Sequence, residues 1–565
     1  MKKMKKAAVM ILALTTVFSS VGCQSPKSEI DESKTQLIIG YKSAGYGTAW
    51  VEGAKKMFEE KFAKHSFEAN KTGVQVWVTY GKDEFTGSTF YDAFSGRAED
   101  LYLGADIWNS MYNENYLYDL TELVNEPLTE FGESKSIAEK VLPFVKESGY
   151  WNNGAVWQIP VMTGSFGLTV YDVDLFEEKG YYVTENGEWT KGTAEDKAKS
   201  KGFDGIAGTY DDGLPITEAD WTRLLNRIYG RGDIPLTWTG LNDSYGTGWM
   251  ESMFLNYDDG KAQKIYNSSS GEYTLLHKNT DGTYSLDDKP TKFEGAKNFY
   301  EMARFPAYYE AINMAYEFIK NPNNFSKETF KTTQTHIEAQ NEFLTSIIAD
   351  ERLAMIFEGS WWETESDDTF TRMAKNDEKM SKHNRRFGVM PTIKLDGNTA
   401  TKHAYQVSSG IGWIPAKTAK KGGGTFEAAK MFCKMLGSDE FLNMCTKATN
   451  IPVAYDIDYK ADTLNSMTYF GRQLVEIIQD EHNTHVLLSD GRYFNPTFKF
   501  HASYPMHFTS NVDDPLSSAT YVVAPLNYFR FDATGKTPEN YFDCMYKYNC
   551  LIYDKNFAET YGARS

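Results

Sequence analysis

The sequence predicts an α/β protein with more than one domain, built around a parallel sheet. Two observations lead to this fold class. The chain has 565 residues, which exceeds what one hydrophobic core usually serves, so roughly two to four domains of ~100–200 residues are expected. Near its start, strand-like and helix-like patterns also alternate, and this order favours parallel strands joined by right-handed crossovers.

The first elements follow in order from residue 36. The run QLIIGY (36–41) is apolar and ends at a glycine-rich turn, so it predicts a buried strand. The stretch AWVEGAKKMFEEKF carries apolar residues at helical spacing, which predicts an amphipathic helix. Alternating valines in GVQVWVTY predict a second strand, and ADIWN predicts a short third one.

Later segments divide into helical and irregular stretches. ITEADWTRLLNRIYGRG (216–232) predicts a helix with Thr217 as its N-cap. Residues 186–213 predict a loop insertion, and 257–292 a β-rich or irregular one. Helical pattern dominates 294–349, and 426–445 predicts two helices broken at Gly437. ERLAMIFEGSWWETE (351–365) predicts a strand, a turn at Gly359-Ser360 and two tryptophans directly behind it.

Composition narrows the classes of function. The formal net charge is −18 and repels phosphate backbones, so nucleic acid is not expected as a partner. Aromatic residues make up 15% of the chain, which leaves flat side chains for a ligand. No phosphate-binding loop, G-x-S-x-G elbow or zinc-binding cysteine pattern is present, so the sequence offers no evidence for an enzyme or a metal site.

The first 23 residues read as a targeting segment. MKKMKK is a basic start, 7–18 are apolar, and small residues precede Cys23. This resembles the bacterial lipoprotein signal, which implies lipidation of Cys23 and a polar tether over 24–35; plain secretion is the alternative. Among the remaining cysteines, Cys544 and Cys550 are spaced for a small disulfide loop, and free thiols are equally compatible with the sequence.

Aromatic residues that follow strand ends form the candidate ligand site. Trp108 and Asn109 follow one predicted strand, and Trp361 and Trp362 follow another. Ligands bind outside the carboxyl ends of strands in open α/β sheets, and a sugar ring packs well on an indole. Adjacent residues on an extended or turn backbone point in different directions, so at least one tryptophan of the pair is expected in the core.

Several motifs, in a fixed order over about 36–455, resemble the extracellular sugar-binding proteins of bacterial ABC importers, the superfamily that includes maltose-binding protein. They are LIIGYKSAGYGTAWVEGAKKMFEEKF, ADIWNSMYNENYLYDLTELV, WQIPVMTGSFGLTVYDVDLFEEKG, PITEADWTRLLNRI, RLAMIFEGSW with FGVMPTI, and AAKMFCKMLGSDEFLNMCTKATNIPV. The resemblance implies two α/β lobes with a ligand cleft between them. The first lobe would take 36–161 and 391–450, and the second 162–390 and 451–565.

The same resemblance implies which loops face the ligand. They contain Tyr41, Lys42 and Tyr46 after the first strand, Trp108 and Asn109, Trp361 and Trp362, and Ser409. It further implies a monomer held at the outer face of the cell membrane by its lipid, with a carbohydrate ligand, a permease partner and no cofactor. An oligosaccharide is the expected ligand. A secreted glycoside hydrolase, a peptide-binding transport receptor and a glycan adhesin remain the alternatives.

Overall fold

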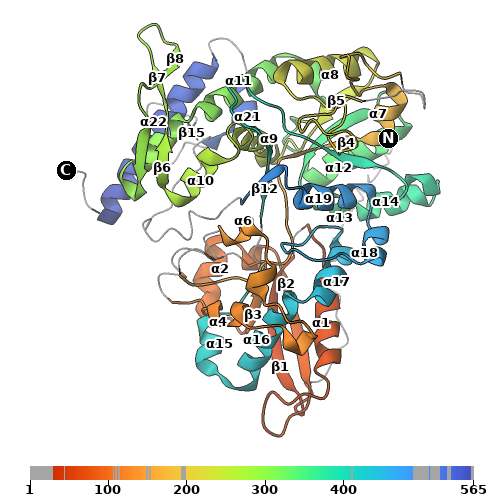
Figure 1. The fold of residues 1–565 in the computed structure, drawn as a ribbon, viewed down its shortest axis with the longest axis vertical. Helices are drawn as coiled ribbons and strands as arrows, with labels where there is room; N and C mark the ends of the chain where they lie inside the picture. The colour runs from red at the N-terminus through yellow and green to blue at the C-terminus, as the bar shows by residue number, and fades with distance from the viewer. Residues whose placement is uncertain are drawn as a thin grey trace, which may run out of the picture.

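The computed structural model describes residues 30–43, 45–105, 107, 111, 115–147, 151, 154–191, 199–408, 411–487, 508–509, 522–530 and 536–561. Two four-stranded sheets define two α/β lobes, which form the lower and upper bodies in Figure 1. The fold class predicted from the sequence is therefore confirmed. No helix in the described part of the chain is both long and apolar enough to cross a bilayer.

The first lobe is built on a mainly parallel sheet in the order β13-β3-β1-β2. β1 runs parallel to both β2 and β3, as the alternation of strands and helices predicts. β13 is antiparallel to β3 and returns from the far end of the chain. The strands are β1 (Thr35–Lys42), β2 (Val74–Gly81), β3 (Leu101–Leu103) and β13 (Gly412–Trp413).

Helices cover this sheet, and their apolar faces follow the predicted spacing. Trp50, Ala54 and Phe58 on α1 are buried. The break at Gly437 separates α16 from α17, as expected. The helices are α1 (Ala49–Lys61), α2 (Gly87–Ala93), α4 (Thr121–Asn125), α5 (Ile137–Lys140), α6 (Pro143–Lys146), α15 (Ala416–Lys421), α16 (Gly423–Leu436), α17 (Asp439–Thr449) and α18 (Ala461–Ser466), with 3-10 turns η1 (Asp83–Phe85), η2 (Phe94–Gly96) and η3 (Thr129–Phe131).

One predicted strand of this lobe is misplaced. ADIWN was expected to form it, but the strand is Leu101–Leu103, whose three side chains are all buried. Gly104 follows with φ +70°, a conformation that glycine adopts readily. The apolar run LYL therefore forms the strand, and Trp108 and Asn109 lie outside the described residues.

The second lobe is built on a mixed sheet in the order β11-β4-β10-β5. β10 is parallel to β5 and antiparallel to β4, and all six of its residues are buried. The strands are β4 (Leu168–Asp172), β5 (Ile234–Thr237), β10 (Leu353–Glu358) and β11 (Phe387–Met390). The helices around it are α7 (Val173–Lys179), α8 (Glu218–Gly230), α9 (Ser244–Leu255), α11 (Pro306–Lys320), α12 (His336–Thr345), α13 (Trp362–Glu365), α14 (Asp367–Ala374) and α19 (Tyr469–Gln479), with 3-10 turns η6 (Pro322–Asn324), η7 (Ser346–Ile348) and η8 (Glu378–Met380).

Helix α8 confirms the prediction for 216–232. Thr217 is its N-cap, and with Asp220 it forms a reciprocal capping box, which satisfies amide groups that the first turn leaves open. Trp221, Leu224 and Ile228 are buried on one face. The local sequence was sufficient here because cap and apolar stripe agree with each other.

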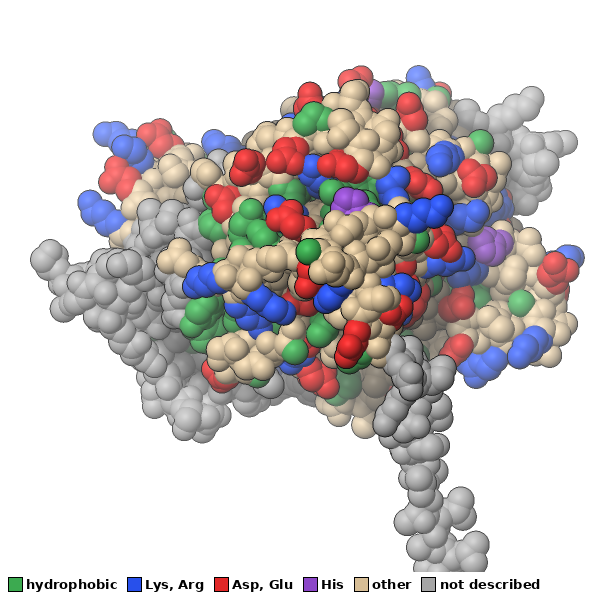
Figure 2. Space-filling view, turned by 90° about the horizontal axis from the view of Figure 1, so that it is seen from below, with side chains coloured by type: hydrophobic (Ala, Val, Ile, Leu, Met, Phe, Trp, Pro, Cys, Tyr) green, Lys and Arg blue, Asp and Glu red, His purple; other side chains and the backbone are tan. Residues whose placement is uncertain are grey.

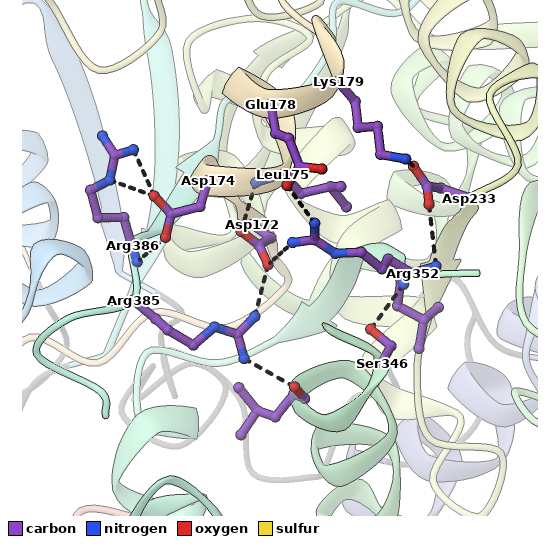
Figure 3. Close-up of polar contacts among 12 residues, drawn as sticks. Asp172, Asp174, Leu175, Glu178, Lys179, Asp233, Ser346, Arg352, Arg385 and Arg386 are labelled. Carbon is purple, nitrogen blue, oxygen red and sulfur yellow. Dashed lines mark hydrogen bonds and ion pairs between the residues drawn. The ribbon is translucent and has the colours of Figure 1, made fainter. Parts of the chain in front are cut away.

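A buried ion-pair network ties the second lobe together where β4 ends and β10 begins (Figure 3). Asp172 caps α7 by accepting from the Leu175 amide at 3.0 Å. Its other carboxylate oxygen lies 2.7 Å from Arg385 Nη2 and 3.7 Å from Arg352 Nη2. The three side chains come from β4, the start of β10 and the segment before β11, so the network fixes their register.

The insertions form an additional unit beside the second lobe, on the left of Figure 1. The 257–292 segment is β-rich, as expected, and the C-terminal helix α22 packs against it, since Lys278 forms an ion pair with Asp543 and the Tyr284 hydroxyl donates to Asp543. Helix α22 also contacts α11, where Tyr309 Oη donates to Glu539 Oε1 at 2.9 Å. Its elements are α10 (Lys261–Ser268), β6 (Ser270–Tyr273), β7 (Leu276–Lys278), β8 (Tyr284–Leu286), β9 (Thr291–Glu294), η4 (Gly295–Lys297), η5 (Phe299–Arg304), α21 (Pro525–Arg530) and α22 (Pro538–Tyr561). Two further strand pairs are described. β12 (His403–Val407) pairs with β14 (Asn483–Leu487), and β15 (Phe508–Thr509) pairs with β16 (Val522–Val523).

The disulfide considered for Cys544 and Cys550 is not formed. Both cysteines lie on α22, six residues apart, and neither is in a disulfide. A rise of about 1.5 Å per residue separates them by ~9 Å along the helix, more than a disulfide spans. Cys433 and Cys445 are also free, and both are buried.

Core packing shows where the chain passes between lobes. Ile393 and Leu395 pack in the core beside β4 and α8, whereas Val407 packs beside β1. Ile451 and Tyr455 also pack beside β1. Val407 and the 451–455 segment therefore pack with the first-lobe core. The lobe boundaries expected from the sequence, at 391 and 450, stay predictions.

Candidate functional site

Two loops at carboxyl ends of strands, one from each lobe, meet at the candidate site. The first follows β1 and carries Tyr46; the second follows β10 and carries Trp361. Their rings are in edge-to-face contact, with centroids 5.8 Å apart and an interplanar angle of 83°. We call the surroundings of this contact the interlobe site. It is defined by Tyr46, Phe166, Tyr245, His336, Trp361 and Glu365.

The turn after β10 explains why the two tryptophans diverge. Gly359 lies beneath the Trp361 indole, where a β-carbon would overlap the ring. Trp361 then caps the one-turn helix α13 with φ −85° and ψ −6°. Each helical residue is rotated by about 100° from the last, so the next side chain points elsewhere. Trp361 stays half-buried at the interlobe site, and Trp362 turns inward.

Trp362, which the sequence analysis expected at the ligand, lies in the core of the second lobe. Its side chain is 0% exposed and packs against Phe343, Phe387 and Phe470 in the second-lobe core. The sequence required one tryptophan of the pair to be core, and the structure assigns that role to Trp362. Its local environment is entirely aromatic and aliphatic, so a ligand does not reach it in this conformation.

Tyr41 is likewise a supporting residue. It is 3% exposed, its hydroxyl donates to Gly47 O at 2.5 Å, and it accepts from Trp50 Nε1 at 3.1 Å. Tyr41 thus holds the loop that carries Tyr46 instead of facing a ligand. Lys42 is the last residue of β1 and is half-buried.

Four other predicted residues lie outside the described part of the chain. They are Cys23, Trp108, Asn109 and Ser409. The neighbours of Trp108 that are described, Ile107 and Met111, are buried with Phe90 in an aromatic cluster of the first lobe. The roles predicted for these four residues stay predictions.

Aromatic side chains that the sequence did not single out extend the site. Phe166 is nearly parallel to Trp361, with centroids 5.8 Å apart. Tyr245 meets Phe166 edge-on at 5.2 Å and lies parallel to His336 at 6.1 Å. Phe166 comes directly after a segment that crosses between lobes, which was a usable signal. Nothing in the sequence around Tyr245 and His336 marked them.

Serine hydroxyls line the contact between the lobes. The Tyr46 hydroxyl is hydrogen-bonded to Ser360 and Ser408, and burial raises its pKa to about 12. Ser360 Oγ accepts from the Ser165 amide at 3.0 Å, and Gly164 and Ser408 exchange backbone hydrogen bonds. One tyrosine of the first lobe therefore reaches both the turn of the second lobe and a crossing segment.

Two glutamates share one glutamine below the rings. Gln340 Nε2 donates to Glu358 Oε1 at 3.0 Å and to Glu365 Oε2 at 2.9 Å. Glu358 is 1% exposed, and burial raises its pKa well above the usual range. Glu365 remains partly exposed, with Oε1 3.7 Å from His336 Nε2. Only Glu365 of this pair is placed to accept hydrogen bonds from a ligand.

The first lobe also places the charge of Lys82 and the backbone of Gly45 near Glu365. Burial raises the pKa of Glu365, while the Gln340 hydrogen bond and the charges of His336 and Lys82 oppose that effect. Lys82 follows β2 in the first lobe. A β-carbon on Gly45 would lie 2.5 Å from Trp361 Cδ1 and 2.8 Å from Glu365 Oε1, so only glycine permits this approach.

Across the described residues, no group of three or more His, Cys, Asp or Glu side chains is arranged to hold a metal ion. The interlobe site thus offers aromatic faces, hydroxyl groups and one accessible carboxylate. On the outer face seen from the first-lobe end (Figure 2), acidic and basic side chains are interspersed instead of forming a single-sign patch.

Comparison with known proteins gives a structural likeness only. No protein-family model and no curated protein sequence matches the chain. Among solved structures, it is similar to the bacterial solute receptor AcbH, described as exclusive for β-D-galactopyranose, with 12% identity, TM-score 0.53, and coverage of 92% of this chain and 100% of that one.

Two further structures give the same likeness. The solute-binding protein RafE in complex with raffinose has 11% identity and a TM-score of 0.53 over 92% of this chain and 100% of that one. A chitin oligosaccharide binding protein has 13% identity and a TM-score of 0.52 over 93% and 100%. The chain thus has the two-lobe fold of the solute-binding proteins, as the sequence motifs predicted.

Proposed function

We propose that this protein is the carbohydrate-binding receptor of an ABC importer, which captures an oligosaccharide by closing its lobes. The observation that carries this proposal is the Tyr46–Trp361 contact, where an aromatic side chain of each lobe meets beside Ser360 and Glu365. A pyranose packs its C–H face on an indole while its hydroxyl groups seek hydroxyl and carboxylate partners. The interlobe site has both kinds of group.

Closure would follow from differential binding. A ligand that touches both lobes binds the closed form more tightly than the open form and shifts the population toward it. The closed shape is then what a membrane permease recognises. The solved structures of the same fold include RafE in complex with raffinose and a chitin oligosaccharide binding protein, which supports a carbohydrate as the ligand class. Lipidation of Cys23 would hold the receptor at the outer face of the membrane.

A glycoside hydrolase is the second candidate, because Glu358 and Glu365 lie close together. Retaining and inverting glycosidases need two carboxyl groups that flank the scissile bond. Glu358 is buried and bonded to Gln340 and to the Gly359 amide, so it does not reach a substrate in this conformation. This arrangement favours a binding protein over a hydrolase.

Calorimetric titration of residues 24–565 tests the proposal. The panel is galactose, raffinose, and malto-, xylo- and chito-oligosaccharides, with chromatography of each mixture afterwards. Saturable one-to-one binding of a sugar without shortened products supports the receptor. Shortened products would indicate a hydrolase, and silence across the panel would contradict a sugar receptor. A monosaccharide that binds as tightly as its oligomers would contradict the oligosaccharide assignment.

Trp361→Ala localises the site on the same sample. The matched control is Trp77→Ala, because Trp77 is also half-buried but lies on β2 with its Nε1 bonded to Gln36. Loss of binding in Trp361→Ala with normal binding in Trp77→Ala would place the sugar at the interlobe site. Equal affinities in both variants would place it elsewhere.

A further inference from the structure

One buried carboxyl group joins the two lobes behind the aromatic contact. Glu363 lies on α13, two residues after Trp361, and is 3% exposed. Its Oε2 accepts from Thr468 Oγ1 and from Asn450 Nδ2, both at 2.7 Å. Its Oε1 is buried and has no hydrogen-bond partner among the described residues. The interlobe site itself does not use this group.

Its two partners belong to opposite lobes. Asn450 is the C-cap of α17, which packs on α1 in the first lobe. Thr468 is the N-cap of α19, which packs against β11 in the second lobe. Glu363 therefore lies where the chain passes from one lobe to the other. The next residue on α13, Thr364, reaches Thr449 O at 3.4 Å.

The geometry around Asn450 makes this junction specific. Asn450 has φ +61°, a left-handed conformation that asparagine tolerates better than most residues. Its Oδ1 accepts from the Thr468 amide at 3.0 Å while its Nδ2 donates to Glu363. Both ends of the Asn450 amide are thus committed, and the Glu363 carboxyl group completes the link between α17, α19 and α13.

We propose that closure of the lobes is linked to uptake of one proton at the carboxyl group of Glu363. The inference rests on the lobe closure in the proposed function. When the lobes separate, α13 moves away from Thr449 and Asn450, and water reaches Glu363 Oε1. When they close, the carboxyl group is enclosed with one oxygen unpartnered, and enclosing a neutral carboxyl group costs less than enclosing a charged one.

The electrostatics of the site also favour the neutral carboxyl group in the closed form. Burial raises the pKa of Glu363 to about 7, against the Thr468 and Asn450 hydrogen bonds and the charge of Lys382. A carboxyl group with a raised pKa in the closed form favours that form below the pKa, and the effect is lost as pH rises through about 7. Between pH 8 and pH 6, one such proton raises the closed-to-open ratio about tenfold.

The other charged groups around Glu363 are few. Lys382, after η8, pairs with Asp367 on α14 at 2.5 Å. Arg472 on α19 donates to Met467 O. Glu365 on α13 itself turns toward Gln340 and His336. His336 and Glu365 are titratable as well, so the variants must separate their contribution from that of Glu363.

The first experiment needs no ligand. Small-angle X-ray scattering of residues 24–565 at pH 8 and pH 6 compares the radius of gyration of the wild-type chain, of Glu363→Gln and of Glu440→Gln. Glu440 is an exposed residue of α17 and serves as the matched control. We expect the wild type and Glu440→Gln to be more compact at pH 6, and Glu363→Gln to be compact at both. A wild-type radius that does not change, or a change that persists in Glu363→Gln, overturns the proposal.

Asn450→Gly provides the second variant. Glycine keeps the left-handed backbone but removes the donor to Glu363, so we expect a normal circular dichroism spectrum and a less compact molecule at both pH values. A radius of gyration equal to that of the wild type at both pH values would overturn the proposal that Asn450 and Glu363 link the two lobes.

For any sugar that binds, titration in buffers of different ionisation enthalpy at pH 6.5 counts protons directly. We expect fractional proton uptake in the wild type and none attributable to Glu363 in Glu363→Gln. Equal uptake in the two overturns the proton linkage while the receptor function stands. Absence of any sugar binding contradicts the proposed function, whereas the scattering experiment still tests the pH dependence.

Discussion

Trp361 and Trp362 are adjacent in sequence, but the Trp361 ring faces the first lobe and the Trp362 ring packs in the core of the second. The Trp361 ring contacts Tyr46 of the first lobe at 5.8 Å, whereas the Trp362 ring contacts Phe387 of the second-lobe core at 5.0 Å. The turn at Gly359 and the start of α13 produce this divergence. The core tryptophan anchors the short helix, and that anchorage fixes the direction in which its neighbour points.

Alanine substitutions should separate these two roles. Trp362→Ala removes a fully buried indole, so we expect a loss of about 3–5 kcal/mol in the free energy of unfolding, measured by urea denaturation. Trp361→Ala should change that free energy far less, because the ring is only half-buried. It should instead weaken sugar binding about tenfold or more, equivalent to about 1.4 kcal/mol.

The opposite pattern would contradict the assignment. If Trp361→Ala unfolds as easily as Trp362→Ala, the Trp361 ring is structural. If a stable Trp362→Ala preparation retains all its stability, the enclosed position of that ring is wrong. Binding should be measured at a temperature at which both variants are folded, checked by circular dichroism.

Gly45→Ala should impair closure without impairing folding. A β-carbon at this position would meet Trp361 Cδ1 at 2.5 Å only when the lobes are together. Overpacking of this kind costs about 1–3 kcal/mol, which here falls on the closed form alone. We expect weaker sugar binding in titration calorimetry and an unchanged melting temperature.

Gly96→Ala is the control for that experiment. Apart from the glycine itself and its neighbours along the chain, no atom of the described residues lies within 4 Å of the position its β-carbon would take. It should bind as the wild type does. Equal affinities for Gly45→Ala and wild type would show that the loop after β1 does not approach Trp361 in the liganded protein.

Local sequence was sufficient where several signals agreed. The strand over Leu353–Glu358 is apolar up to Phe357, and Gly359 follows it, so both the strand and its turn were predicted. Helix α8 had a cap and an apolar stripe together. Trp361 was singled out because it follows a predicted strand, and the carboxyl ends of such strands carry ligand loops. Tyr46 was singled out because the family resemblance places its loop beside the ligand.

The rest depended on contacts between distant parts of the chain. Tyr245 and His336 reach the site from α9 and α12, and no local pattern distinguishes them from other aromatic residues. Whether Trp361 or Trp362 faces inward depended on the turn geometry, which the residue types alone leave open. The third strand was misplaced for a similar reason. The segment with Trp108 was expected to form it, but the strand is the shorter buried run LYL, and local pattern does not decide between the two.

Tyr46→Phe should weaken ligand binding through the closed form. The hydroxyl is hydrogen-bonded to Ser360 and Ser408, and the ring contact with Trp361 does not require it. Losing one such bond costs about 0.5–1.5 kcal/mol, so we expect a severalfold loss of affinity. Calorimetric titration with the sugar that binds measures it.

Tyr229→Phe is the matched control, because Tyr229 is 52% exposed on α8. Its affinity should equal that of the wild type. If Tyr46→Phe also binds normally, the hydroxyl is not part of the closed contact. If both variants lose affinity alike, the effect is not specific to the interlobe site.

Asp172→Asn should destabilise the second lobe strongly. Asparagine can still accept from the Leu175 amide and cap α7, so the substitution removes the charge while keeping the cap. Arg385 is 3% exposed and would then be a buried cation without its carboxylate (Figure 3). Leaving one partner of a buried pair uncompensated costs about 3–5 kcal/mol. Urea unfolding measures the loss, with the exposed Asp288→Asn as the unaffected control.

The same pair allows a stricter test of that cause. If the loss comes from the unpaired charge and not from the shape of Asp172, the double variant Asp172→Leu with Arg385→Met should be more stable than Asp172→Asn alone, because apolar replacements of buried ion pairs are often nearly neutral. A double variant at least as unstable as the single one would mean that the network acts through its geometry. The hydrogen bond from Arg385 Nη1 to Leu344 O at 3.0 Å, which methionine cannot make, would then be the interaction to restore.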